Sequence, residues 1–283
     1  MRSENAIMSE FMKWANSNES VRMAILTSSR AAKKCELDFL SDYDIELYVS
    51  DIGVFMSDEW LNVFGDVMVR WPYKPRCTGD EGWITRLVLF DDGVRIDFQI
   101  TDNRNIEFER YKNGYKVLLD KDNRTMDIPD ATYDEFIIKK PTREEYETVV
   151  NEFWWNVYYV PKYLWRDQLP FSKFMLDNIL RYEYLHTVVD WYIGLEHDWK
   201  IETGALGKKY KEILSADDWS EFETTYVGGG IDENWKALKR LTSLFRRLGK
   251  KISDELGYEY PDEVDRKVMI FCEKIMDTEK LKN

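Results

Sequence analysis

Apolar and polar residues alternate with a period of two in several segments of the first half of the chain, as is typical of half-buried strands. The clearest segment is SDYDIELYV (41–49), whose apolar face consists of Ile45, Leu47 and Val49. Its other face carries Asp42, Asp44, Glu46 and Tyr48. Further strands are predicted at 21–27, 67–71 and 115–120, after a helix at 4–16. This half is therefore predicted to form a sheet.

Two more predicted strands, at 83–90 and 94–100, flank the sequence DDG and read as a hairpin, because Asp-Gly is a frequent tight turn. In the second strand the residues expected to point inward are Val94, Ile96, Phe98 and Ile100. Those expected on the other face are Arg95, Asp97 and Gln99. A third aspartate thus lies on the polar face of a second strand.

The apolar spacing becomes helical after about residue 140. Pro141 precedes a capping box, Thr142 with Glu145, which marks the start of a helix. Further helices are expected at 171–195, from Trp235 to Ile252 and at 264–276. A shorter helix is expected to begin after Ser215, which would cap it together with Asp218. We therefore predict an α+β protein, with a mixed sheet and helices in residues 1–140 and an all-α bundle in residues 141–283.

Composition indicates a folded, reduced protein. The 283 residues are 44% hydrophobic and 15% aromatic, enough for a large core. Three scattered cysteines and two histidines form no zinc pattern. The first 16 residues lack the apolar stretch of a secretory signal. We therefore expect a cytoplasmic protein that does not bind a membrane. The net charge of −13 also argues against nucleic acid as a partner.

Asp42, Asp44 and Asp97 are the strongest candidates for chemistry. Asp42 and Asp44 share one strand face, and same-face neighbours lie roughly 6–7 Å apart. Two carboxylates at that spacing can hold one divalent ion or a pair of ions, whereas the simpler interpretation is a solvated edge that opens with turn-forming aspartates. Upstream, LTSSR ends the first strand with residues suited to a phosphate-binding turn, Ser28, Ser29 and Arg30. Together these features favour nucleotidyl transfer.

The pattern TSSR…SDYDIELYV…RIDFQI is similar to that of the nucleotidyltransferases. In the second half, NEFWWNVYYVPKYLWRDQLPF, DWYIGLEHDWKIETGALGKKYKEIL, TYVGGGIDENWKAL and LFRRLGKKI resemble the helical domain of the aminoglycoside 6-adenylyltransferases, the streptomycin-modifying enzymes. The resemblance covers nearly the whole chain. It implies AMP transfer from Mg·ATP to a hydroxyl of streptomycin's streptidine ring, the 6-position, with release of pyrophosphate.

The resemblance also implies roles for individual residues. Asp42, Asp44 and Asp97 would be catalytic and hold Mg²⁺, with two ions expected, and Asp97 would be either the base or only a third ligand. Nucleotide contacts would come from Ser28, Ser29, Arg30 and Lys208. Two positions depart from the family, which usually has glycine in place of Ser28 and a lysine in place of Ala205. Each departure removes a feature suited to phosphate binding.

Asp190 is the best candidate for recognising the cationic acceptor, because a carboxylate inside the apolar run HTVVDWYIGL needs a partner. It could instead pair internally. Glu152 and Trp155 are the next candidates. Open alternatives are another acceptor (a different aminoglycoside, a lincosamide or a protein) and a non-catalytic protein that binds nucleotide or antibiotic. We expect small-molecule partners only, and a monomer or weak dimer.

Overall fold

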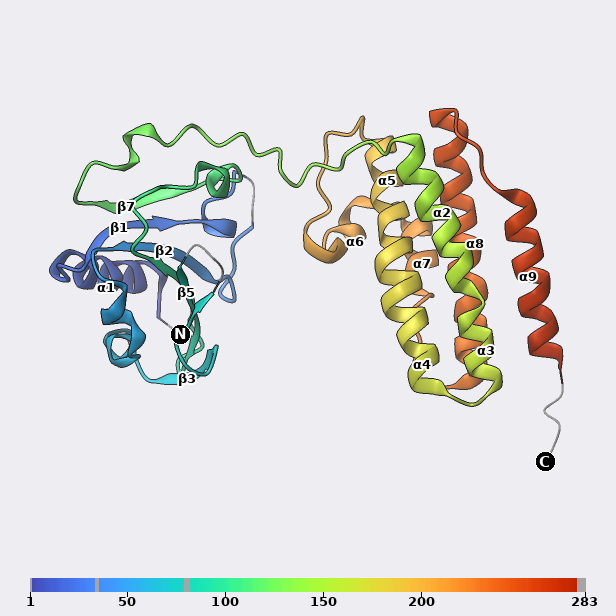
Figure 1. The fold of residues 1–283 in the computed structure, drawn as a ribbon, viewed down its shortest axis with the longest axis horizontal. Coiled ribbons are helices and arrows are strands. Elements are labelled where there is room, and N and C mark those ends of the chain that lie inside the picture. The colour runs from blue at the N-terminus through green and yellow to red at the C-terminus, as the bar shows by residue number, and fades with distance from the viewer. Residues whose placement is uncertain (1, 34–35, 79–81, 279–283) are drawn as a thin grey trace. The chain divides into compact units, whose positions relative to one another are not determined.

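The computed structural model describes residues 2–33, 36–78 and 82–278 (Figure 1). The chain divides into two compact units, Met1–Glu135 and Phe136–Asn283. The first contains the sheet and the second is helical, as the α+β prediction requires. The expected boundary after residue 140 lies close to this division. Each unit is described by itself below.

The first unit is a mixed sheet with the strand order β3-β5-β6-β2-β1-β7, and β4 pairs with β5. The strands are β1 Val21–Leu26, β2 Tyr43–Val49, β3 Val67–Trp71, β4 Cys77–Thr78, β5 Trp83–Phe90, β6 Arg95–Thr101 and β7 Lys116–Asp120. Strands β2 and β6 are parallel, and the other pairs are antiparallel. The predicted strands and the β5–β6 hairpin are confirmed, whereas the two-residue strand β4 carries too little pattern to predict.

One face of the sheet packs under helix α1 (Glu4–Ser17) and the short 3₁₀ helices η2 (Ile52–Met56) and η3 (Glu59–Phe64). The predicted inward residues Ile45, Leu47 and Phe98 are at most 1% exposed. Trp14 and Trp60 stack at 5.5 Å above this face. Apolar burial of this extent is the main stabilising contribution to the unit.

The other face of the sheet is covered as well, which the alternation did not predict. Glu46 and Tyr48, expected on a polar face, are 5% and 0% exposed. Glu46 pairs with Arg110 at 2.6 Å and accepts a hydrogen bond from the Tyr111 hydroxyl at 2.7 Å. A buried carboxylate needs such partners. The segment around Tyr111 thus covers this end of β2, whereas Asp42 and Asp44 at the other end are half-buried.

The second unit is a bundle of helices. They are α2 Arg143–Val157, α3 Tyr159–Trp165, α4 Leu169–Phe174, the π-helical segment η6 Met175–Leu185, α5 His186–Glu196, α6 Tyr210–Ile213, α7 Ala216–Glu223, α8 Ile231–Leu256 and α9 Asp262–Asp277. The predicted capping box is formed, with Glu145 N donating to Thr142 Oγ1 at 3.2 Å and Thr142 N donating to Glu145 at 2.7 Å. The predicted cap at Ser215 is also present.

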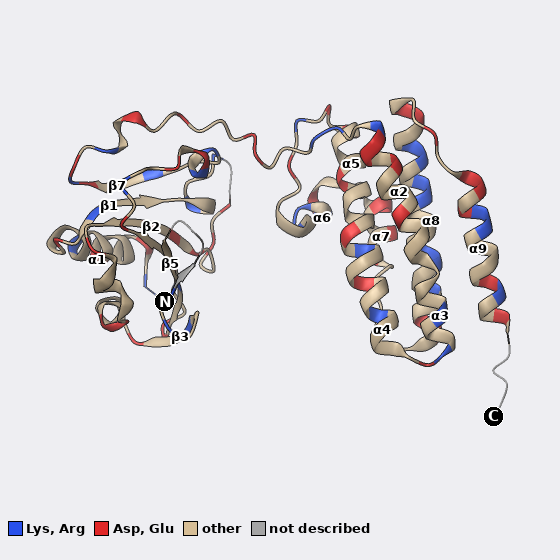
Figure 2. Ribbon diagram, viewed as in Figure 1, with Lys and Arg blue, Asp and Glu red and all other residues tan. Residues whose placement is uncertain are grey.

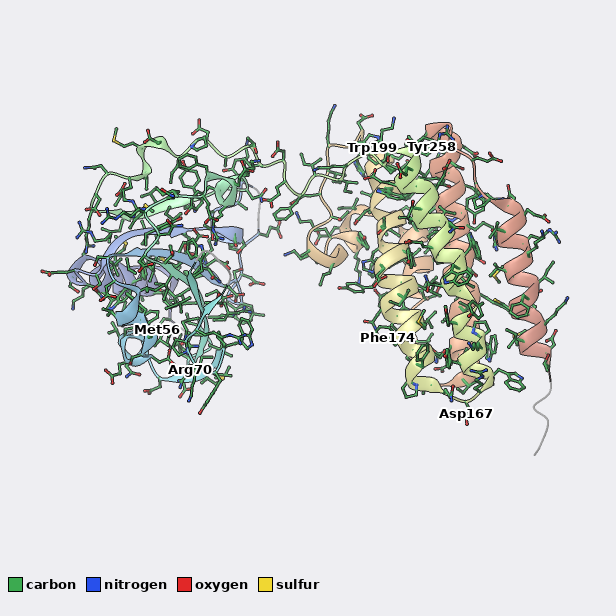
Figure 3. All side chains as sticks on the ribbon, in the orientation of Figure 1. Met56, Arg70, Asp167, Phe174, Trp199 and Tyr258 are labelled. Atoms are coloured by element: carbon green, nitrogen blue, oxygen red, sulfur yellow. The ribbon has the colours of Figure 1, made fainter. Side chains whose placement is uncertain are left out.

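Helices α2 and α8 share the core of the bundle, where the rings of Phe153 and Phe245 stack at 3.5 Å. Basic residues recur along the exposed side of α8, which Figure 2 shows in blue. The helix expected at 171–195 is confirmed as the contiguous run of α4, η6 and α5, whose middle part is π-helical. Helix α3 ends at a turn containing Asp167, labelled in Figure 3. No helix in the described ranges is long and apolar enough to traverse a bilayer.

Candidate active site

Two adjacent parallel strands bring the acids together. In the β2–β6 pairing, Asp44 lies directly opposite Asp97. Neighbouring strands are about 4.8 Å apart, so the two carboxylates start from closely spaced backbone positions. Asp42 lies immediately before β2, one same-face position from Asp44. The three aspartates expected to act together are therefore neighbours in the fold.

Burial raises the pKa values of Asp42 and Asp44. The pKa of Asp44 is raised to about 6, first by burial and then by the charges of Asp97 and Asp42. The pKa of Asp42 is also raised, chiefly by burial. Like charges in a partly desolvated cluster disfavour the ionised form. Such a cluster requires a counter-charge, and the structure supplies one.

The counter-charge is Arg95 at the start of β6. Its Nε donates to Asp97 Oδ1 at 2.9 Å and its Nη2 donates to Asp97 Oδ2 at 2.6 Å, a two-pronged contact. Its Nη1 lies 3.2 Å from Asp42 Oδ2. Arg95 therefore joins two of the three aspartates. The sequence signal for this contact is a basic residue two positions before the third acid, on the same strand face.

Ser28 begins η1 (Ser28–Arg30), a single 3₁₀ turn after β1. Its φ of 55° lies in the left-handed region that favours glycine. Its side chain lowers the pKa of Asp44 through hydrogen bonding, against the larger effect of burial. Ser29 is half-buried beside it. The serine at this position thus combines a strained backbone with a polar group that acts on an active-site acid.

Arg30 is turned into the protein. It is 6% exposed, with its guanidinium 3.7 Å from the ring centre of Tyr43. It donates to the carbonyls of Asp42 at 2.9 Å and Ser41 at 2.8 Å, and it pairs with Glu4 at 3.0 Å. These contacts fix the chain just before β2. Arg30 therefore positions Asp42, and a direct phosphate contact would require it to leave these partners.

The chemistry of the three aspartates fits magnesium, which prefers carboxylate oxygens. Within the described residues, however, no group of three or more His, Cys, Asp or Glu side chains is already arranged to hold a metal ion. The guanidinium of Arg95 contacts both oxygens of Asp97. The carboxylates that could bind magnesium are therefore present, and the guanidinium of Arg95 contacts two of them, Asp42 and Asp97.

Asp190 on α5 belongs to a hydrogen-bond network inside the helical unit. Its Oδ1 accepts from the hydroxyl of Thr203 at 2.7 Å and from that of Tyr210 at 2.8 Å. Burial raises its pKa, and these two hydrogen bonds oppose the shift. The internal pairing that the sequence left open is thus present, and both hydrogen bonds reach the same carboxylate oxygen.

The remaining candidates lie on the surface of the helical unit. Trp155 on α2 is 65% exposed, and Glu152, one helical turn before it, is exposed as well. Lys208 is exposed after the glycine-containing turn 204–207. In the part of the chain that the structure describes, no hydrogen bond or ion pair joins these three to Asp190. Figure 3 shows the side chains of this unit.

A mixed sheet that presents in-register aspartates on adjacent parallel strands, beside a short serine turn, defines a nucleotidyltransferase. A sequence model described as streptomycin adenylyltransferase matches residues 1–275. The chain therefore belongs to the streptomycin adenylyltransferase family, as the sequence resemblance indicated.

Curated relatives extend over the same length. The chain is 33% identical over 268 residues to the aminoglycoside 6-adenylyltransferase of Bacillus subtilis (strain 168), covering 93% of this chain and 94% of the relative. It is 30% identical over 267 residues to the protein of the same name from Campylobacter jejuni, covering 92% of each. The crystal structure of an aminoglycoside 6-adenyltransferase from Bacillus subtilis aligns with a TM-score of 0.50 at 29% identity, covering 98% of this chain and all of that one.

Proposed function

We propose that this enzyme transfers AMP from Mg·ATP to a hydroxyl of an aminoglycoside, the 6-position of streptomycin's streptidine ring, and releases pyrophosphate. Family membership supports the reaction class. The observation that carries the chemistry is the set of Asp44 and Asp97 in register on adjacent strands with Asp42 beside them. The proposal includes the cytoplasm as the compartment, where Cys272 would remain the free thiol that the structure describes.

In the proposed reaction the acceptor oxygen bonds to the α-phosphorus of ATP, and the bond from that phosphorus to the pyrophosphate oxygen breaks. Asp42, Asp44 and Asp97 would hold magnesium, which when bound neutralises charge on the phosphates. Asp97 is the proposed acceptor of the hydroxyl proton. Before it can do so, its carboxylate must be freed from Arg95, because both of its oxygens are hydrogen-bonded to that guanidinium.

The other proposed roles follow from position. Residues 28–30 form the turn next to Asp44, and Ser28 and Ser29 are proposed to contact the nucleotide from the sheet unit. Lys208 is a proposed phosphate contact, because it is exposed after a turn that contains two glycines with positive φ, Gly204 and Gly207. Residues 1–140 would be the catalytic domain and residues 141–283 the domain that binds the acceptor, with Asp190, Glu152 and Trp155 as its ligands.

Pyrophosphate release tests the proposal directly. The purified protein is incubated with Mg·ATP and, separately, streptomycin, other aminoglycosides and a lincosamide. We expect acceptor-dependent pyrophosphate with streptomycin, and a loss of at least about 100-fold in kcat for Asp44→Asn, since removing one group that stabilises transition-state charge costs about 10²–10³. Asp122→Asn, at an exposed ion pair with Arg22, is the matched control.

If pyrophosphate is released with another acceptor but not with streptomycin, the proposed reaction stands and the proposed acceptor is wrong. A near-normal rate for Asp44→Asn would show that the proposed active site is wrong. Nucleotide binding without release on any acceptor would favour a non-catalytic binding protein.

A further inference from the structure

A side chain of the protein already offsets part of the negative charge of the acid cluster. Arg95 forms two hydrogen bonds to Asp97 and lies 3.2 Å from Asp42. A guanidinium in this fork geometry uses both oxygens of the carboxylate at once. Those oxygens are also the ones with which Asp97 would bind a cation. Arg95 and a divalent cation therefore compete for the same donor atoms.

The two arginines near the cluster differ in their freedom to move. Arg30 is 6% exposed and held by Asp42, Ser41 and Glu4. The side chain of Arg95 is 43% exposed, whereas that of its partner Asp97 is 11% exposed. Arg95 can thus leave the carboxylates for water without any change in the core, whereas Arg30 cannot.

We propose that Arg95 is a displaceable counter-cation: it holds Asp42 and Asp97 together in the metal-free enzyme, and a divalent cation binds by displacing its guanidinium. The inference rests on the proposed function, because it takes Asp42 and Asp97 as cation ligands. It also accounts for the absence, among the residues described, of a ready-made ligand set around these acids. The cost of displacing Arg95 lowers the affinity of the site for a divalent cation. A higher cation concentration is therefore needed to fill the site than if Arg95 were absent.

Cation affinity measured without turnover tests this inference. Mn²⁺ is titrated into the metal-free protein by calorimetry and by electron paramagnetic resonance, for wild type and for Arg95→Met, which retains an unbranched side chain and removes the charge. We expect the variant to bind Mn²⁺ at least about fivefold more tightly. Arg22→Met is the matched control, because it removes one positive charge from the same unit at the exposed pair with Asp122. It should bind like wild type.

Thermal stability gives a second readout. Without a metal ion, Arg95→Met should melt at a lower temperature than wild type, because the three acids lose their counter-charge. Saturating Mn²⁺ should raise its melting temperature by more than it raises that of wild type, since at the same concentration a tighter-binding ligand stabilises the folded state more, by RT ln(1 + [L]/Kd). If Arg95 were merely structural, Arg95→Met would lower the melting temperature by the same amount with and without Mn²⁺.

The outcomes separate the two proposals. If wild type binds Mn²⁺ in a manner abolished by Asp44→Asn, and Arg95→Met binds it equally or more weakly, the displacement inference is wrong and the metal site stands. If wild type and Asp44→Asn give the same titration, the metal site of the proposed function is wrong, and the inference falls with it.

Discussion

At the scale of single residues, Ser28 shows two opposing effects at one position. Its left-handed backbone, with φ of 55°, is unfavourable for any residue with a Cβ. Its hydroxyl lowers the pKa of Asp44, an effect that glycine would not have. Ser28 therefore combines an unfavourable backbone conformation with a polar group that acts on an active-site acid.

The two effects at Ser28 can be measured separately. Ser28→Ala removes only the hydroxyl, and Ser28→Gly removes the hydroxyl and the Cβ together. We expect the glycine variant to be more stable than the alanine variant by about 1 kcal/mol, the usual cost of a left-handed non-glycine residue. Urea unfolding of both variants gives this difference. Equal stabilities would mean that the backbone at this position carries no strain, and the KM for ATP of the same pair reports whether the Cβ crowds the nucleotide.

Asp190 allows a sharper test of acceptor recognition. Asp190→Asn should weaken streptomycin binding by about 1.5–3 kcal/mol, the worth of a hydrogen bond to a charged group, and leave the affinity for ATP unchanged. Calorimetric titration of both ligands measures this. Tyr210→Phe removes one internal hydrogen bond to Asp190 and keeps the charge, so it is the matched control. If both variants bind streptomycin like wild type, Asp190 is a structural acid of the bundle.

At the scale of elements, the start of α5 buries a histidine. His186 packs against the rings of Tyr182, Tyr210 and Phe222, and its Nε2 lies 3.5 Å from the Tyr226 hydroxyl. Burial, with a smaller effect of the Arg181 charge, lowers the pKa of His186 to about 4. The folded helical unit therefore holds this imidazole neutral.

The helical unit should lose stability as the pH falls from about 6.5 to about 4, because the unfolded chain binds a proton at His186 that the folded chain does not. The loss should reach roughly 3 kcal/mol, given a pKa lowered from 6.5 to about 4 and about 1.36 kcal/mol for each pKa unit. Urea unfolding at several pH values measures it. His186→Gln should flatten this dependence relative to wild type. His197→Gln, at the exposed second histidine, is the control, and an unchanged slope in the His186 variant would contradict the prediction.

Elements differ in how far the sequence predicts them. The alternation around Ile45 and Leu47 predicted β2 correctly, because strands with one buried face must repeat every second residue. The burial of Glu46 was not predictable, since the Tyr111 segment that covers it has no period. The residue types of Asp44 and Asp97 suggested a shared site, but their register follows only from strand pairing. The spacing of Arg95 and Asp97 places both on one strand face, but the two-pronged contact also requires the long side chain of Arg95 to fold back onto Asp97, which the spacing alone does not determine.

At the scale of the whole molecule, the chain has separate hydrophobic cores in its two units. The bundle core, around Phe153 and Phe245, contains residues of the second unit only. The sheet core, around Trp14 and Phe98, contains residues of the first unit only. A unit with its own core meets the requirement for independent folding.

The fragment 136–283 should therefore fold when produced alone. We expect a helical circular dichroism spectrum and a cooperative urea transition, since single domains of this size usually unfold in one step. The intact protein under the same conditions is the reference. A fragment with a disordered spectrum would show that the helical unit depends on the first unit for its structure.

The two-residue separation of Arg95 and Asp97 has a consequence during synthesis. A growing chain that has released β2 from the ribosome exposes Asp42 and Asp44 long before β6 exists. The third acid then emerges almost together with the guanidinium that pairs with it. When β6 adds beside β2, the nascent sheet receives a new negative charge and its neutralising partner in the same step. The three carboxylates are thus brought together only when the guanidinium of Arg95 is also present.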